Sequence, residues 1–377
     1  MTKKEWIRMI AFCLVVCIMM VLLCDLFETE NTKNFDSRLY TYRTYEEGAV
    51  DAVFIGTSGV DRYWVGPKAY EDYGMTVYPL ATDGMPAWLY TDMIDYALEY
   101  QDIDLVMLDI RAFCQDTKTD IMSSKSMDVK ARRVLDSMPW FSPIFFQIAF
   151  KSMRLIHEQD PTRPRFDISF LLSFVRYHQK WQSAGLNFLK NNLGSRYHKY
   201  GGFYMTRSLT PVSQPQESFV FSSTGASLMD PLSEAALYEV LEYVEEKGLK
   251  LLLVDTPQFP TKREMNRIRC VYEKLDALDV DYVTYYAYDS EDPFTIDLDP
   301  ETDFYNRGHV NFYGAEKFTD VLAAYLHENY DLPDRRNDPV AQECWDGLYE
   351  NILKTMENYI ANPSTKPVPE EEEDEGE

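Results

Sequence analysis

The chain has 377 residues, enough for one large domain with appendages, and its hydrophobic fraction of 45% is ordinary for a globular protein. Its formal net charge is -25, and the chain remains acidic when the terminal stretch 370–377 is set aside. A surface that binds nucleic-acid phosphates needs clustered Lys and Arg, so we expect no nucleic-acid partner.

The six cysteines do not form a recognisable pattern. Three lie in an N-terminal apolar run, which leaves only Cys114, Cys270 and Cys344 for the domain, an odd number at wide spacings. This spacing indicates neither a disulfide framework nor a zinc site, so we expect three buried or half-buried thiols.

The N-terminus has the pattern of a membrane anchor. Basic residues (Lys3, Lys4 and Arg8) precede an apolar run over 9–24, which Asp25 closes. The run is shorter than the roughly 20 residues that span a bilayer, but its flanking apolar residues and a snorkelling Arg8 extend it. Positive charge before the run and acid after it predict a cytoplasmic N-terminus and an extracellular main domain.

Three alternatives compete with an uncleaved anchor, and one of them, a buried core helix, rarely has such lopsided flanking charges. A signal peptide would have small residues at a cleavage site, and none stand around Leu22–Asp25; a lipoprotein signal would have a small residue before Cys24, where the chain has Leu23. We therefore expect a cytoplasmic stub and transmembrane anchor over 1–27 in the cell membrane, followed by a polar linker over 28–50.

Short apolar runs alternate with helical patterns from residue 51 onward. Strands are expected over 51–56, 75–80, 105–110, 250–254 and 281–286, and helices over 86–100, 232–246, 262–278 and 312–329. Strands that are apolar throughout and alternate with helices predict an α/β domain, with a parallel sheet covered on both faces.

A long segment, 112–231, separates the third and fourth strands within the expected domain 51–361. It has helical patterns at 129–135 and 166–189, and a structureless loop of this length is implausible in a compact domain. We expect a large, mostly helical insertion that packs over the carboxyl edge of the sheet. The Pro-rich and then acidic stretch 362–377 is expected to be a disordered tail.

A serine and a histidine are expected at the carboxyl edge of the sheet, where ligands of parallel sheets bind. Ser58 follows the first strand in a Gly-Thr-Ser-Gly turn, and His309 stands in a polar turn before the last helix. The first turn is not the G-x-S-x-G elbow, because Val60 occupies the last position. Each motif alone is more often a structural turn without a catalytic role. Together, the serine and the histidine are a candidate nucleophile and general base.

The strand followed by Gly-Thr-Ser, and the Gly-His-Val-Asn-x-x-Gly-Ala motif at 308–315, resemble the first and last blocks of the SGNH/GDSL hydrolase superfamily. The resemblance covers about 51–329 and implies a three-layer α/β/α flavodoxin-like fold with acyl-ester chemistry. With its anchor and insertion, the chain is most similar to the DltD-like and alginate-acetylation-like branch. Proteins of that branch work outside the cell beside membrane-bound O-acyltransferases.

The chain departs from the family at the acid and at the oxyanion hole. The family's acid stands three residues before the histidine, where this chain has Asn306, which orients an imidazole without adding charge. Asp303 is an alternative acid, but six residues is the wrong spacing. The third strand ends without the family's asparagine, so the resemblance leaves the backbone N–H groups of Ser58 and Gly84 as the oxyanion hole.

We expect no metal and no cofactor. Four aspartates fall near strand ends (Asp83, Asp109, Asp255 and Asp303), but they show no ordered ligand spacing and such residues commonly cap turns. We expect Arg111 to pair with a carboxylate. The turn after the first strand also lacks the lysine of a phosphate-binding loop.

Two functions remain open. The first is an extracytoplasmic esterase or acyltransferase of a cell-envelope glycan or other polymer, transferring or removing an acetyl or, as second choice, a D-alanyl group through Ser58 and His309. The second is a catalytically weak or inactive SGNH-fold protein that binds a membrane O-acyltransferase, and Asn306 favours this alternative.

Overall fold

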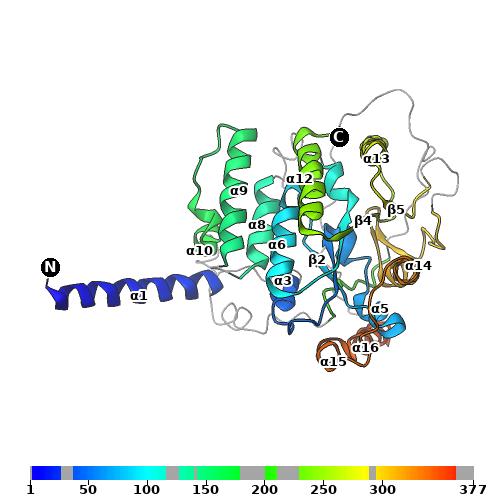
Figure 1. Ribbon diagram of the computed structural model, residues 1–377, viewed down its shortest axis with the longest axis horizontal. Helices are drawn as coiled ribbons and strands as arrows, with labels where there is room; N and C mark the ends of the chain where they lie inside the picture. Colours follow the sequence, from blue (N-terminus) through cyan, green and yellow to red (C-terminus); the bar gives the residue numbers. More distant parts are fainter. Residues whose placement is uncertain are drawn as a thin grey trace.

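A computed structural model of the chain describes residues 2–26, 37–115, 127–139, 142–178, 200–209, 229–287 and 294–361 (Figure 1). The expected acidic tail lies outside these residues, as do parts of the expected linker and insertion.

Five parallel strands form the central sheet, in the order β2-β1-β3-β4-β5. They are β1 (Ala52–Gly56), β2 (Val77–Ala81), β3 (Leu105–Asp109), β4 (Lys250–Asp255) and β5 (Tyr282–Thr284). Ala52 pairs with Val77 on one side and with Leu105 on the other. The strand order therefore reverses at β1, and the carboxyl ends of β1 and β3 are where a parallel sheet of this kind opens to a ligand.

Alternate residues of each strand face two separate cores. In β1, Val53 and Ile55 belong to one core, and Ala52 and Phe54 belong to the other. The first core is covered by α3 (Ser37–Tyr42), α6 (Tyr90–Tyr100), α8 (Met127–Ser137), α9 (Pro143–Gln159), α12 (Pro231–Lys247) and α15 (Pro339–Trp345). The second is covered by α14 (Phe312–Asn329) and α16 (Leu348–Ala361), while α5 (Gly66–Tyr73) and α13 (Lys262–Ala277) contribute to both. The predicted α/β class, with a parallel sheet covered on both faces, is confirmed.

Local chemistry sets the helix boundaries. α12 ends at Gly248, whose φ of 69° is the left-handed conformation of a helix cap. α13 begins with a capping box, in which Thr261 and Glu264 satisfy each other's backbone N–H groups. α14 has the bounds that the sequence predicts. The helix expected over 86–100 is divided into a short 3₁₀ turn, η1 (Ala87–Leu89), and α6.

The expected linker over 28–50 is wrong from residue 37 onward, because this segment packs into the domain. Arg38 is only 1% exposed and forms an ion pair with Asp61 at 2.9 Å. The Tyr42 hydroxyl donates to the Ala97 carbonyl at 3.0 Å. The polar side chains of this segment are therefore buried against bonding partners, and residue 37 already belongs to the domain.

The described parts of 112–231 are mostly helical, and some of them contact the loops at the carboxyl edge of the sheet, as where the Tyr204 N–H donates to the Asp61 carbonyl at 2.7 Å. α9 packs on α6 and extends one layer, whereas α8 reaches the edge through Arg133, which donates to the Asp83 carbonyl at 3.2 Å. The helix expected over 166–189 does not form within 166–178. That stretch contains only η3 (Ile168–Phe170) and α10 (Ser173–Arg176), because the Asp167 side chain caps a short turn. Residues 179–189 lie outside the described ranges.

One apolar helix, α1 (Lys3–Leu26), projects from one side of the domain in Figure 1. Its residues Lys3–Cys24 have a mean hydropathy of 2.8 and only 6% of the apolar window is buried, so α1 is long and apolar enough to cross a membrane. This is consistent with the predicted single-pass anchor.

Candidate active site

The turn after β1 is built around a close approach to the end of β3. A Cβ on Gly56 would lie 2.3 Å from Asp109 Cβ, so only glycine fits there. The Thr57 N–H donates to Asp109 Oδ2 at 3.2 Å, and the Thr57 hydroxyl donates to the same oxygen. The Thr57 side chain also accepts from the Gly59 N–H at 3.1 Å and caps α4 (Ser58–Asp61). Ser58 thus stands on a fixed backbone at the first position of that helix.

The histidine comes from the opposite end of the chain. A small antiparallel pair, β6 (Phe304–Asn306) and β7 (His309–Val310), holds Asn306 opposite His309. Ser58 Oγ lies 2.7 Å from His309 Nε2, and His309 Nδ1 lies 2.9 Å from Asn306 Oδ1. All three side chains are half-buried. The structure therefore brings the three residues predicted from the sequence into one hydrogen-bonded chain.

The tautomer of His309 follows from a neighbouring backbone group. The Gly308 N–H donates to Asn306 Oδ1 at 2.9 Å, and since a backbone N–H only donates, the Asn306 atom facing it is the carbonyl oxygen. The same oxygen faces His309 Nδ1, which must therefore carry the proton. Nε2 is left with its lone pair directed at the Ser58 hydroxyl, as a general base requires.

Asp303 does not take the place of the missing acid. Its side chain is buried, accepts from Lys317 Nζ at 2.7 Å and accepts from the Asp299 N–H at 2.7 Å. It therefore fastens the loop before β6 to α14, and the residue that faces His309 Nδ1 is Asn306.

Arg111 ties the histidine loop to the sheet, a role that the sequence did not predict. Its Nη1 donates to the Gly308 carbonyl at 2.7 Å, and its Nη2 donates to the carbonyls of Thr256 and Pro257 at 3.1 Å and 3.0 Å. The guanidinium also lies over the ring of Tyr63, 5.0 Å from its centroid. We expected it to pair with a carboxylate; instead its guanidinium donates to carbonyls of the two loops that border the site and to the Tyr63 hydroxyl at 3.0 Å.

The carboxyl groups of Asp109 and Asp83, near the site, have positively charged or hydrogen-bonding neighbours. Burial raises the pKa of Asp109 above its ordinary value, while the Arg111 guanidinium and the donors on Thr57 oppose that rise. Burial alone would also raise the pKa of Asp83, but Arg62, 2.8 Å away, together with Arg133 and Arg38 outweighs burial and lowers that pKa to about 2. Asp83 is therefore ionised and paired at neutral pH.

The loop after β2 contains Gly84. The Thr82 N–H donates to the Gly56 carbonyl at 3.2 Å, which sets this loop beside the end of β1. A turn closes from the Met85 N–H to the Thr82 carbonyl at 3.1 Å, and Gly84 has a φ of 68°, which favours glycine. The structure therefore places the start of the loop that contains Gly84 beside the end of β1; the role of Gly84 as an oxyanion donor remains a proposal.

The four strand-end aspartates do not converge. Asp83 bonds to Arg62, Asp109 to Thr57, Asp255 to Tyr272 and Asp303 to Lys317. Within the described ranges, no group of three or more His, Cys, Asp or Glu side chains is placed to hold a metal ion.

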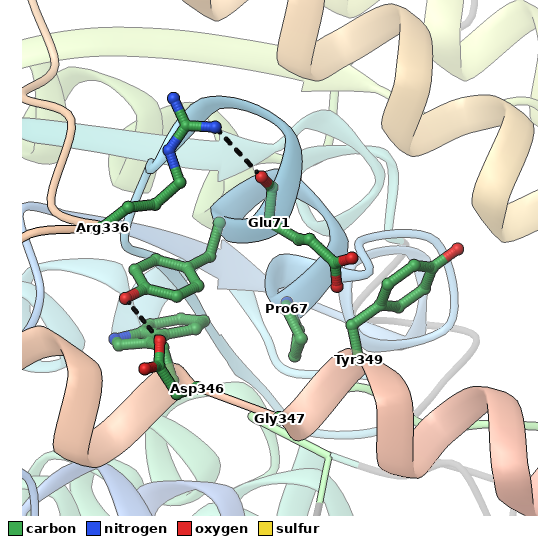
Figure 2. Close-up of a pocket in the computed structure, with 8 residues that line it drawn as sticks. Pro67, Glu71, Arg336, Asp346, Gly347 and Tyr349 are labelled. Atoms are coloured by element: carbon green, nitrogen blue, oxygen red, sulfur yellow. Dashed lines mark hydrogen bonds between the residues drawn. The ribbon is translucent and has the colours of Figure 1, made fainter.

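A separate hollow of about 300 Å³ lies between α5, α15 and the start of α16 (Figure 2). Two of its polar side chains have partners: the Tyr70 hydroxyl donates to Asp346 Oδ1 at 2.9 Å, and Arg336 donates to the Glu71 carbonyl at 3.2 Å. Neither Ser58 nor His309 lines it. The hollow and the Ser-His-Asn chain are therefore different places on the molecule.

In comparisons with known proteins, the sequence matches no family model and no curated protein.

Proposed function

We propose that this protein is a membrane-anchored acyl esterase or acyltransferase of SGNH type. The observation that supports this most directly is the hydrogen-bonded chain from Ser58 Oγ through His309 to Asn306, with the imidazole in the tautomer of a general base. The strand order 2-1-3-4-5 and the Gly-Thr-Ser and Gly-His-Val-Asn motifs agree with the flavodoxin-like architecture of that superfamily.

In the proposed reaction, Ser58 Oγ attacks the carbonyl carbon of an acyl ester and its proton passes to His309 Nε2. The C–O bond of the ester then breaks, and the departing alcohol takes the proton from His309. A water molecule or an acceptor hydroxyl repeats the sequence on the acyl-serine and regenerates Ser58. The backbone N–H groups of Ser58 and Gly84 stabilise the oxyanion.

The proposed substrate is an acylated cell-envelope glycan or other polymer, with acetyl as the first choice of acyl group and D-alanyl as the second. The flanking charges of α1 support an extracellular domain, since basic residues precede the apolar run and acidic residues follow it. The resemblance to envelope-acylating SGNH proteins supports the chemistry.

A second candidate function has one observation in its favour. Asn306 is neutral, so it orients His309 without stabilising an imidazolium by charge. In this alternative the domain binds a membrane-bound O-acyltransferase or a glycan and has little activity of its own.

The two functions differ in what Ser58 is for. In cells that produce Ser58→Ala at the wild-type level, the enzyme proposal predicts a changed content of ester-linked acyl groups in the envelope. The matched control is Ser152→Ala, which removes a hydroxyl that is fully buried in α9 and donates to the Ile148 carbonyl. Envelope acylation that depends on the protein but is unchanged by Ser58→Ala would refute the enzyme and support the binding partner.

A further inference from the structure

The last turn of α1 is held against the domain. Cys24 is 2% exposed, and its carbonyl accepts a hydrogen bond from Ser173 Oγ of α10 at 2.5 Å. Almost all of the helix before it is exposed. The contact fixes α10 at the end of the apolar run.

This contact sets the height of α10 relative to a bilayer. Cys24 is the last apolar residue before Asp25, and at about 1.5 Å per residue the helix ends about 3 Å beyond it. An apolar run that spans a bilayer ends where the hydrocarbon core gives way to headgroups. Ser173 and α10 therefore lie at the level of the headgroups of the leaflet next to the domain.

An exposed segment lies next to α10 on the same side. The chain from 161 to 166 is exposed throughout, and it joins α9 to η3 along the side of the domain from which α1 projects (Figure 1). At the end of this segment, Phe166 is 55% exposed and Ile168 is 46% exposed. Large apolar side chains next to the end of an anchor are typical of contact with a membrane interface.

These apolar side chains are presented by a fixed backbone. Asp167, between them, accepts from the Ser169 N–H at 2.9 Å and from Arg132 Nη2 at 2.8 Å. Arg132 in turn lies over the ring of Phe170, 4.1 Å from its centroid. With Asp167 held towards α8, Phe166 and Ile168 remain on the outer surface.

Two arginines border the apolar pair. Arg165 is exposed, and its Nε donates to His157 Nε2 at 3.2 Å rather than to a carboxylate. Arg163 is exposed too, and its nearest carboxylates, on Asp160 and Asp128, are 3.8 Å and 3.9 Å away. In a chain of net charge -25, positive charge at this place complements anionic phosphates.

We propose that Arg163, Arg165, Phe166 and Ile168 form a membrane seat, a surface that rests on the bilayer crossed by α1. Phe166 and Ile168 lie at the boundary of the acyl chains, and the two arginines bind lipid phosphates. The seat and α1 together hold the domain in one orientation on the membrane. The inference depends on α1 as a membrane anchor and is independent of the chemistry at Ser58.

The test uses the full chain in nanodiscs of phosphatidylcholine and phosphatidylglycerol, with Phe166→Trp as a reporter. Lipids brominated on the acyl chains quench an indole that touches them. After subtraction of the parent protein's emission, we expect the introduced indole to lose at least half of its emission. The matched control is Tyr238→Trp on α12, where the side chain is 44% exposed, and its emission should be unchanged.

The proposal is overturned if the protein is in the disc and each variant emits as strongly in brominated discs as in plain ones. A protein partner would then be the occupant of this surface. Arg163→Gln with Arg165→Gln, in the Phe166→Trp background, should reduce the quenching when phosphatidylglycerol is present. Unchanged quenching would refute the phosphate contact. Because Ser58→Ala should leave the quenching unchanged, a failure of the membrane-seat proposal can be distinguished from a failure of the proposed enzyme function.

Discussion

The substitution Asn306→Asp measures how much a carboxylate at this position contributes to catalysis. In the wild-type site, Asn306 Oδ1 lies 2.9 Å from both His309 Nδ1 and the Gly308 N–H. A carboxylate oxygen has the same size and accepts both bonds, so we expect the geometry and the tautomer to be kept. The only change is a negative charge beside the imidazole.

The expected gain in transition-state stabilisation follows from the separation of the carboxylate and imidazolium charges. Two unit charges 4 Å apart interact by about 4 kcal/mol at an effective dielectric of about 20, and less where water screens them. Because His309 and Asn306 are half-buried, we take a quarter to a half of this, about 1–2 kcal/mol of transition-state stabilisation. At about 1.4 kcal/mol per decade, kcat/KM should rise about tenfold. The acid limb of the pH–rate profile should move to higher pH, because the carboxylate favours the protonated imidazole.

The assay is initial-rate hydrolysis of p-nitrophenyl acetate by the full-length protein in detergent. Asn337→Asp, at an exposed position, adds the same charge elsewhere and should leave the rate unchanged. Asn306→Ala removes the orienting oxygen and should lower the rate by about 10²–10⁴. If Asn306→Asp and Asn306→Ala both hydrolyse the ester at the wild-type rate, His309 does not act as the base and the account is refuted.

Three further outcomes follow from the contacts around the site. Arg111→Met removes the donors to three loop carbonyls, so kcat should fall about 10²-fold with KM nearly unchanged; a raised KM at constant kcat would contradict a positioning role. Arg62, together with Arg133 and Arg38 and working against burial, lowers the pKa of Asp83 to about 2, so the ionised carboxylate stabilises the fold above its unfolded pKa of about 3.9 and this stability is lost as the pH falls from about 4 towards 2. With Asp83 one-third exposed, we expect about 1 kcal/mol, and urea unfolding of Asp83→Asn should show a correspondingly flatter dependence over that range. Gly56→Ala sets a methyl group 2.3 Å from Asp109 Cβ and should cost about 3 kcal/mol, read as a lower thermal midpoint; a wild-type midpoint would show that the β1 turn is not tightly packed.

The central sheet could be predicted because its strands are apolar throughout. Short apolar runs located the strands, the helical period located α14, and the topology of a parallel sheet then placed Ser58 and His309 at one edge. Asn306 was indicated only by the resemblance to SGNH hydrolases, whose acid stands three residues before the histidine. The contact of this amide with the Gly308 N–H, which fixes the tautomer, depends on a tight turn that no periodicity reveals.

Other features lay beyond sequence reasoning for physical reasons. β6 and β7 have three and two residues, too short for any hydrophobic period. Arg111 acts on carbonyls of loops about 145 and 197 residues away, and backbone acceptors leave no trace in residue identity. Segment 37–50 was mistaken for a linker because its polar groups are buried in pairs, as Arg38 is with Asp61.

The claim that Ser58 is an activated nucleophile is tested most directly by a fluorophosphonate probe, which reacts with serines that an adjacent base activates. After incubation of the folded full-length protein, peptide mass spectrometry locates the adduct. We predict an adduct on Ser58 that is kept in Ser152→Ala and disappears in both Ser58→Ala and His309→Gln. A folded wild-type protein without an adduct on Ser58, or with equal labelling in His309→Gln, would contradict the account.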